Sequence, residues 1–147
     1  MSRESAVGLR YLELAYRVRR SVDEHLSADG MSLARLKLLQ AIDRLEPVNQ
    51  TGLAGELGLA ARSVTQAVEA LERDGLVRRA ASPADRRAKL VSLTPAGAAA
   101  AEAGAAAGER ALRRIFQVLD AGQRTALAEL LDVVEAGLAT DEAAGKN

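Results

Sequence analysis

The first 28 residues alternate between apolar and polar positions with the period of an α-helix. Apolar side chains recur three or four residues apart, which places them along one face of a helix of about six turns. This stripe is formed by Val7, Tyr11, Leu14, Val18 and Val22. Asp29-Gly30 interrupts the pattern. Ser32 can then cap a second helix, which we expect to end before Pro47.

Residues 49–74 predict a helix-turn-helix. Asn49 can cap a short helix, and Gly58 can form the turn after it because glycine readily adopts a positive φ. From about Ala61 to Asp74, a further helix pattern has apolar residues on one face and polar residues on the other. The polar face carries Arg62, Ser63, Thr65, Gln66 and Glu69. In this motif the second helix enters the DNA major groove.

A basic β-hairpin is predicted directly after these helices. Residues 75–79 and 89–93 are the strands, and the loop 80–88 contains Ser82-Pro83-Ala84-Asp85, a composition typical of turns. The chain has a formal net charge of +0, but residues 76–90 hold five basic side chains and one acidic side chain. Because the distribution of charge matters more than its sum, this hairpin is expected to be a wing that contacts nucleic acid.

Two more helices complete the pattern. Thr94 followed by Pro95 is a helix start, and the helix is expected to continue to Leu119. Asp120, with Gln123 three residues later, resembles a capping box for a final helix that ends near residue 140, before a frayed tail at 141–147. The expected fold is mainly α, with about six helices and a small β-hairpin wing in a single domain, residues 1–147.

The composition excludes several classes of function. The chain has no cysteine and one histidine, His25, so we expect no disulfide, no thiol chemistry, no metal site, no cofactor and no catalytic triad. Carboxylate pairs such as Glu69 and Glu72 are expected to be solvated surface groups, and the protein is not expected to be an enzyme. With no apolar run of roughly 20 residues and no signal peptide, we expect a soluble cytoplasmic protein without a membrane partner.

Three segments together resemble the multiple antibiotic resistance regulator (MarR) family of bacterial winged-helix repressors and activators. They are Leu53-Ala54-Gly55-Glu56-Leu57-Gly58-Leu59, the run from Val64 through Leu71-Glu72-Arg73-Asp74-Gly75-Leu76-Val77 to Arg79, and Asp85-Arg86-Arg87 leading into Leu93-Thr94-Pro95-Ala96-Gly97. The order of elements agrees over nearly the whole chain. Helix-turn-helix segments occur in many bacterial regulators, but the wing motif at this spacing makes the resemblance specific.

The resemblance implies a DNA-binding transcriptional regulator that acts as a homodimer on a palindromic operator. It assigns residues 1–30 and 95–140 to dimerisation helices and residues 31–94 to a winged helix-turn-helix DNA-binding lobe. Amphipathic terminal helices agree with a dimer, because a single copy would leave their apolar stripes exposed. Repression is the expected mode of action, with half-sites roughly 34 Å apart.

The residues expected to contact DNA lie on the recognition helix and the wing. Arg62, Ser63, Thr65 and Gln66 are expected to read base edges in the major groove. Arg86 and Arg87 are expected in the minor groove, and Lys89 at a phosphate. Asp85 is expected to pair with a wing arginine and so to fix the hairpin.

One departure from the family pattern concerns the start of the recognition helix. Many relatives have a serine or aspartate cap where this chain has Ala60, a loss of roughly 1 kcal/mol in typical proteins. The sequence therefore leaves open a start one residue later, which would displace Arg62 and Ser63.

The family resemblance also suggests a small organic effector, usually an aromatic or amphipathic anion held between the dimerisation helices and the DNA-binding lobe. The residues whose rings and charges suit such a ligand are Tyr11, Tyr16, Arg17, Arg20, His25 and Phe116. The alternative is that these are core, paired or surface residues. At the level of the whole protein, the alternatives are a helical protein-interaction scaffold and a DNA-binding regulator without a ligand response.

Overall fold

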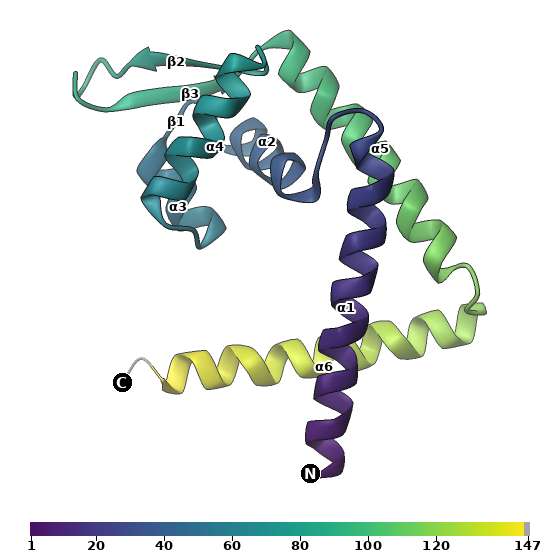
Figure 1. The fold of residues 1–147 in the computed structure, drawn as a ribbon. Coiled ribbons are helices and arrows are strands. Elements are labelled where there is room, and N and C mark those ends of the chain that lie inside the picture. The colour runs from purple at the N-terminus through teal and green to yellow at the C-terminus, as the bar shows by residue number, and fades with distance from the viewer. Residues whose placement is uncertain (146–147) are drawn as a thin grey trace. The chain divides into compact units, whose positions relative to one another are not determined.

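The computed structural model describes residues 1–145 and has the mainly α architecture that the sequence predicts. Its described helices are α1 (Arg3–Ser27), α2 (Leu33–Leu45), α3 (Gln50–Leu57), α4 (Ala61–Arg73), α5 (Pro95–Phe116) and α6 (Ala121–Ala144), as Figure 1 shows. Its strands are β1 (Val48–Asn49), β2 (Val77–Ala81) and β3 (Lys89–Leu93). In residues 1–145, no helix is both long and apolar enough to cross a membrane.

The chain divides into two compact units, Met1–Ala111 and Leu112–Asn147. The boundary lies within α5, whereas the sequence places the edge of the DNA-binding lobe at residue 94. The assignment of particular helices to dimerisation stays a prediction.

Local capping signals set most helix ends in the first unit. Ser32 accepts a hydrogen bond from the backbone N–H of Arg35, and Asn49 accepts one from Gly52. Gly58 ends α3 with φ 62°, a left-handed conformation that glycine adopts without a steric penalty. These three signals confirm the predicted starts of α2 and α3 and the turn of the helix-turn-helix.

The core of the first unit lies among the end of α1, helices α2, α3 and α4, and the sheet. Its largest fully buried side chains are Leu26, Leu39, Ile42, Leu53, Val64, Val68, Leu71 and Val91. Val64, Val68 and Leu71 are the apolar face of α4, so burying them orients the opposite face of that helix toward solvent.

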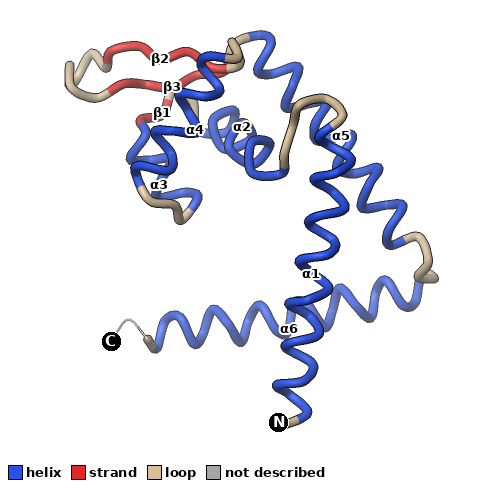
Figure 2. The backbone as a smooth tube through the Cα atoms, viewed as in Figure 1, coloured by secondary structure: helices blue, strands red, loops and turns tan. Residues whose placement is uncertain are grey.

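The sheet has one strand more than predicted. Its order is β1-β3-β2, all antiparallel, and the three strands appear in red in Figure 2. Val48 of β1 pairs with Val91 of β3, and Arg79 of β2 pairs with the same Val91 from the other side. The middle of β3 is therefore hydrogen-bonded to the segment that leads into α3.

Thr94 joins the wing to α5 as the Thr-Pro signal predicts. Its hydroxyl donates to the carbonyl of Gly75 at 2.6 Å and accepts from the backbone N–H of Gly97 at 3.0 Å. Its backbone N–H donates to the carbonyl of Leu76 at 3.1 Å. One residue thus ties the end of the helix-turn-helix to the start of α5.

The second unit contains the end of α5 and the whole of α6. Asp120 and Gln123 form the predicted capping box, with bonds of 2.8 and 3.0 Å. Helix α5 ends at Phe116, earlier than the predicted Leu119, and α6 continues to Ala144. The frayed tail predicted from residue 141 is therefore wrong for residues 141–144, and its last two residues, 146–147, lie outside the described residues.

Candidate nucleic-acid interface

The polar face of α4 is exposed, as the amphipathic pattern predicts. Arg62, Ser63 and Gln66 are all accessible to solvent near the N-terminal end of the helix. Ala60 forms no side-chain cap bond, yet α4 begins at Ala61, so the delayed start is wrong and Arg62 and Ser63 lie in the first turn. Burial of the opposite face offsets the missing cap.

Thr65 differs from these three residues, because it is only partly exposed and its hydroxyl is already hydrogen-bonded. The hydroxyl donates to the carbonyl of Ala61 at 3.0 Å and accepts from the side-chain amide of Gln50 at 2.8 Å. The structure therefore separates Thr65 from the other residues that the sequence groups as base readers.

Arg79 on β2 connects the wing to both helices of the helix-turn-helix. Its guanidinium makes two hydrogen bonds to the Glu72 carboxylate, at 3.1 and 2.9 Å. It makes a third, at 3.5 Å, to the side-chain amide oxygen of Gln50. The two hydrogen bonds between Arg79 and Glu72 lower the pKa of Glu72 and raise that of Arg79, in each case mainly because the side-chain hydrogen bond favours the charged form.

This contact was not predicted from the sequence, in which Glu72 was expected to be a solvated surface group. Glu72 and Arg79 are only seven residues apart and lie on either side of the glycine turn at the end of α4. Their opposite charges across that turn were the available signal. No such signal existed for Gln50, which lies 29 residues before Arg79.

The tip of the wing is fixed by backbone hydrogen bonds. The Asp85 carboxylate accepts from the backbone N–H of Arg87 at 2.9 Å, and its carbonyl accepts from Ala88 at 3.0 Å. Within residues 1–145 Asp85 makes no ion pair, so the predicted pairing with a wing guanidinium is wrong, although the residue does stabilise the hairpin. Arg86 and Arg87 are both exposed at this tip.

A basic hollow of about 340 Å³ lies between the wing and the start of α3. It is lined by Asn49, Gln50, Thr51, Arg79, Arg87, Ala88 and Lys89. The start of α3 contributes the partial positive charge of a helix N-terminus to the same place. Three cationic side chains and a helix start form a surface suited to a phosphate group.

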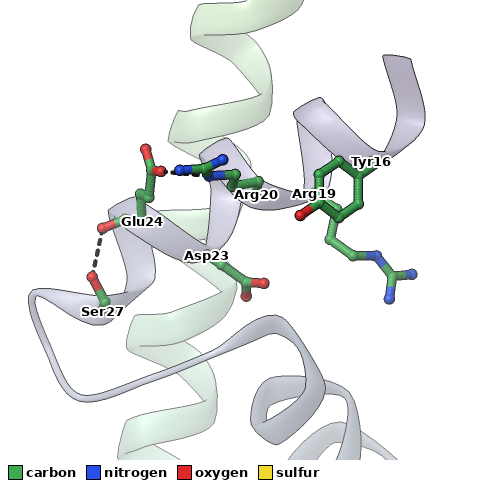
Figure 3. A pocket seen from close by; sticks show the side chains of 6 residues that line it. All are labelled: Tyr16, Arg19, Arg20, Asp23, Glu24 and Ser27. Carbon is green, nitrogen blue, oxygen red and sulfur yellow. Dashed lines mark hydrogen bonds and ion pairs between the residues drawn. The ribbon is translucent and has the colours of Figure 1, made fainter. Parts of the chain in front are cut away.

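The residues predicted for an effector are only partly brought together. Tyr16 and Arg20 line a shallow hollow on α1, together with Arg19, Asp23, Glu24 and Ser27 (Figure 3). Arg20 is paired there with Glu24 at 3.2 Å, while Asp23 accepts from the backbone N–H of Leu33 at 2.7 Å. Two carboxylates among the lining residues make this hollow a poor site for an anion.

The other predicted effector residues do not line this hollow. Tyr11 and Arg17 are exposed on α1, and His25 is exposed with its Nδ1 2.7 Å from the carbonyl of Ser21. Phe116 belongs to the second unit.

A different hollow, of about 390 Å³, is mainly apolar with cations among its lining residues. Its apolar lining comes from Leu33, Ala34, Leu38, Leu57, Leu59, Ala67 and Ala70, and its cations are Arg19, Arg35 and Lys37. Arg35 is paired with Asp74, but its Nε is buried without a hydrogen-bond partner among the described residues. These three cations were not predicted from the sequence, because they belong to helix faces without a recognisable motif.

Comparison with known proteins agrees with the resemblance seen in the sequence. The family model described as "MarR family" matches residues 31–89. The chain is 29% identical over 102 residues to YdgJ of Bacillus subtilis (strain 168), an uncharacterized HTH-type transcriptional regulator. That match covers 69% of this chain and 62% of YdgJ.

Two solved structures extend the likeness to nearly the whole chain. Sco3205 of Streptomyces coelicolor, a MarR family transcriptional regulator in complex with DNA, has 28% identity and a TM-score of 0.77, over 94% of this chain and 93% of its own. CouR of Rhodococcus jostii RHA1, bound to p-coumaroyl-CoA, has 27% identity and a TM-score of 0.72, over 88% and 90% respectively. YdgJ and Sco3205 are described as transcriptional regulators and CouR as a transcriptional repressor, the class that the sequence predicts. The family model over residues 31–89, the shared fold and the wing motif together make this chain similar to the MarR family of winged helix-turn-helix transcriptional regulators.

Proposed function

We propose that this protein is a transcriptional repressor that binds a palindromic DNA operator as a homodimer. The observation that carries the proposal is the exposed polar face of α4, with Arg62, Ser63 and Gln66, held beside a cationic wing. The solved structure of Sco3205 with DNA, and that of CouR, described as a transcriptional repressor bound to a 23-mer DNA duplex, support it.

In this proposal the recognition helix and the wing have separate tasks. Arginine can pair bidentately with guanine and glutamine with adenine, so Arg62 and Gln66 read base edges in the major groove. Arg86 enters a minor groove, whose negative potential attracts guanidinium groups. Arg87 and Lys89, which line the basic hollow at the start of α3, hold a backbone phosphate there.

A second copy of the chain accounts for the apolar surface of the terminal helices. On α1, Val7 is 70% exposed and Leu12 63%, and on α6, Val133 is 70% exposed and Val134 65%. Large apolar side chains exposed to this extent along a helix are typical of an interface. A homodimer would cover it and would present two recognition helices to two half-sites.

The first experiment measures binding to duplex DNA before and after the wing arginines are removed. The duplex is selected by the wild-type protein from a randomised library. Arg86→Ala combined with Arg87→Ala should weaken binding by about tenfold or more at physiological salt, because two cationic contacts are lost. The mass of the dimer, measured by sedimentation, should not change.

Two results would contradict the proposal. An unchanged dissociation constant would remove the wing from the interface. A wild-type protein that binds no duplex at low ionic strength would reject DNA binding and favour a protein-interaction scaffold.

Effector binding is a second function, favoured by the cation-lined apolar hollow between α2 and α4. An apolar lining with Arg19, Arg35 and Lys37 suits an organic anion that has an apolar body. The structure of CouR with p-coumaroyl-CoA supports an effector of this chemistry.

The test of the effector uses p-coumaroyl-CoA and free p-coumarate as probes. Either one should release the wild-type protein from its selected duplex, and Arg19→Ala with Lys37→Ala should abolish the release. Arg17→Ala is the control, because Arg17 is an exposed cation on the same helix that does not line the hollow. Equal release from all three proteins would reject the site, and no release from any would favour a regulator without a response to this class.

A further inference from the structure

Thr65 sits on the recognition helix, but its hydroxyl is directed to the protein. A hydroxyl group can donate one hydrogen bond and accept two. The Thr65 hydroxyl donates to the carbonyl of Ala61 and accepts from the side-chain amide of Gln50, which leaves one acceptor position. Ser63 and Gln66, on either side of it, are more exposed and make no such contact with Gln50.

Gln50 is bonded at both ends of its side-chain amide. The amide nitrogen donates to Thr65 at 2.8 Å, and the amide oxygen accepts from Arg79 at 3.5 Å. Because one partner accepts a hydrogen bond and the other donates one, only one orientation of the Gln50 amide satisfies both. Gln50 is therefore held between α4 and the wing.

Arg79 completes the path back to α4. It is 17% exposed and is held by two hydrogen bonds to Glu72 in the last turns of that helix. The path Thr65–Gln50–Arg79–Glu72 therefore begins and ends on α4 and passes through the start of α3 and through β2. A closed path of this kind fixes both the position of the recognition helix and its rotation relative to the wing.

We infer that Thr65, Gln50 and Arg79 are positioning residues, which set the register of the recognition helix against the wing and so determine base discrimination without reading bases themselves. This inference rests on the proposed DNA-binding function. Contacts to phosphate fix a protein on DNA without reading sequence, whereas contacts to base edges depend on geometry. Removing a hydrogen bond from the path Thr65–Gln50–Arg79–Glu72 should therefore reduce the preference of the protein for its selected duplex over other sequences. Its affinity for DNA of unrelated sequence should stay the same.

The experiment compares two substitutions of Thr65 with opposite chemistry. Thr65→Val keeps the shape and the methyl group but removes the hydroxyl, whereas Thr65→Ser keeps the hydroxyl and removes the methyl group. Each variant is titrated with the selected duplex and with a scrambled duplex of equal length. The measured quantity is the ratio of the two dissociation constants.

We expect Thr65→Val to lower this discrimination ratio by about tenfold, with affinity for the scrambled duplex unchanged, and Thr65→Ser to retain the wild-type ratio. Gln50→Leu should lower the ratio of the two dissociation constants as far as Thr65→Val does, and the double variant should lower it no further than either single variant. That non-additivity is expected because the hydroxyl acts through Gln50. Because Gln50 also lines the basic hollow, only this ratio is compared for the Gln50 variant.

Three outcomes would overturn the inference. A changed base preference in Thr65→Ser, with Thr65→Val unchanged, would make Thr65 a reader that uses its methyl group. Retention of the full ratio in Gln50→Leu would remove the path from discrimination. Equal loss of affinity for both duplexes, accompanied by a lower melting temperature, would indicate a purely structural role. A wild-type protein that binds no duplex is distinguishable from all three, because it rejects the proposed function itself.

Discussion

Replacing Gly97 by alanine should separate the wing from α5. Gly97 lies in the first turn of α5, and a Cβ atom there would lie 1.8 Å from the carbonyl oxygen of Leu76 and 2.9 Å from its carbonyl carbon. Real Cβ contacts essentially never fall below 3.0 Å. The obstacle is backbone, so no change of side-chain rotamer can relieve it, and the first turn of α5 would have to move away from Leu76.

Two effects of Gly97→Ala lower the stability of the protein, and a third effect partly offsets them. Overpacking a well-filled site costs about 1–3 kcal/mol. Moving the start of α5 away from Leu76 also stretches the 3.1 Å hydrogen bond that the Leu76 carbonyl accepts from Thr94, and such a bond contributes about 0.5–1.5 kcal/mol. Alanine favours the helix over glycine by about 1 kcal/mol, which offsets part of this loss. A net destabilisation of about 1–3 kcal/mol remains.

Gly55→Ala is the matched control, because it makes the same chemical change in a helix where space is open. A Cβ at Gly55 would meet nothing within 4 Å, and the residue is exposed within α3. This variant should be more stable than the wild type by about 0.5–1 kcal/mol. The two glycines are therefore expected to give changes of opposite sign.

Denaturant unfolding at one fixed protein concentration measures both variants, since the proposed dimer would make stability concentration-dependent. Thermal unfolding should agree, with a shift of about 2–4 °C for each kcal/mol. If Gly97→Ala were as stable as the wild type, the close approach of α5 to Leu76 would not exist in the folded protein, and the account of this junction would be wrong.

Three further changes test other parts of the structure. Ala60→Ser should stabilise the protein by about 1 kcal/mol in denaturant unfolding, because it supplies the missing cap of α4; no gain would mean that the capping geometry is not available. Arg79 lowers the pKa of Glu72, so the stabilisation from this pair is complete above about pH 4.5 and is lost as the pH falls through the lowered value. Glu72→Gln should therefore flatten the loss of stability in that acidic range, and an unchanged pH profile would contradict the pairing. Leu130→Asp with Val134→Asp places charges on the exposed apolar face of α6 and should give a monomer by sedimentation; a dimer of normal mass would remove α6 from the interface.

The ends of most helices were predictable because their signals are local. Ser32, Asn49 and Asp120 each accept a hydrogen bond from an N–H three residues later, and Gly58 has the positive φ that ends α3. Such signals require only neighbours along the chain. Ala60 shows the limit of this reasoning, because burial of the apolar face keeps α4 in place where the local cap is missing.

Features that depend on distant residues were not predictable in the same way. Strand β1 is only two residues long, and it forms because Val48 pairs with Val91. The bond from Gln50 to Thr65 spans 15 residues. No periodic pattern encodes either contact. The pattern of exposed polar residues on α4 therefore indicated the surface for which we propose DNA binding, but it did not separate Thr65 from its more exposed neighbours.

The corrected role of Asp85 changes the electrostatics expected of the wing. Had the carboxylate paired with Arg86 or Arg87, binding to DNA would have required that ion pair to break. Instead the carboxylate accepts from the backbone N–H of Arg87, and within residues 1–145 neither guanidinium makes an ion pair. The same hydrogen bond, together with the one from the backbone N–H of Ser82 to the carbonyl of Ala88, orders the tip of the wing in the absence of DNA. Since ordering a loop on binding costs free energy, a wing fixed by its own backbone leaves both arginine charges available for the nucleic acid.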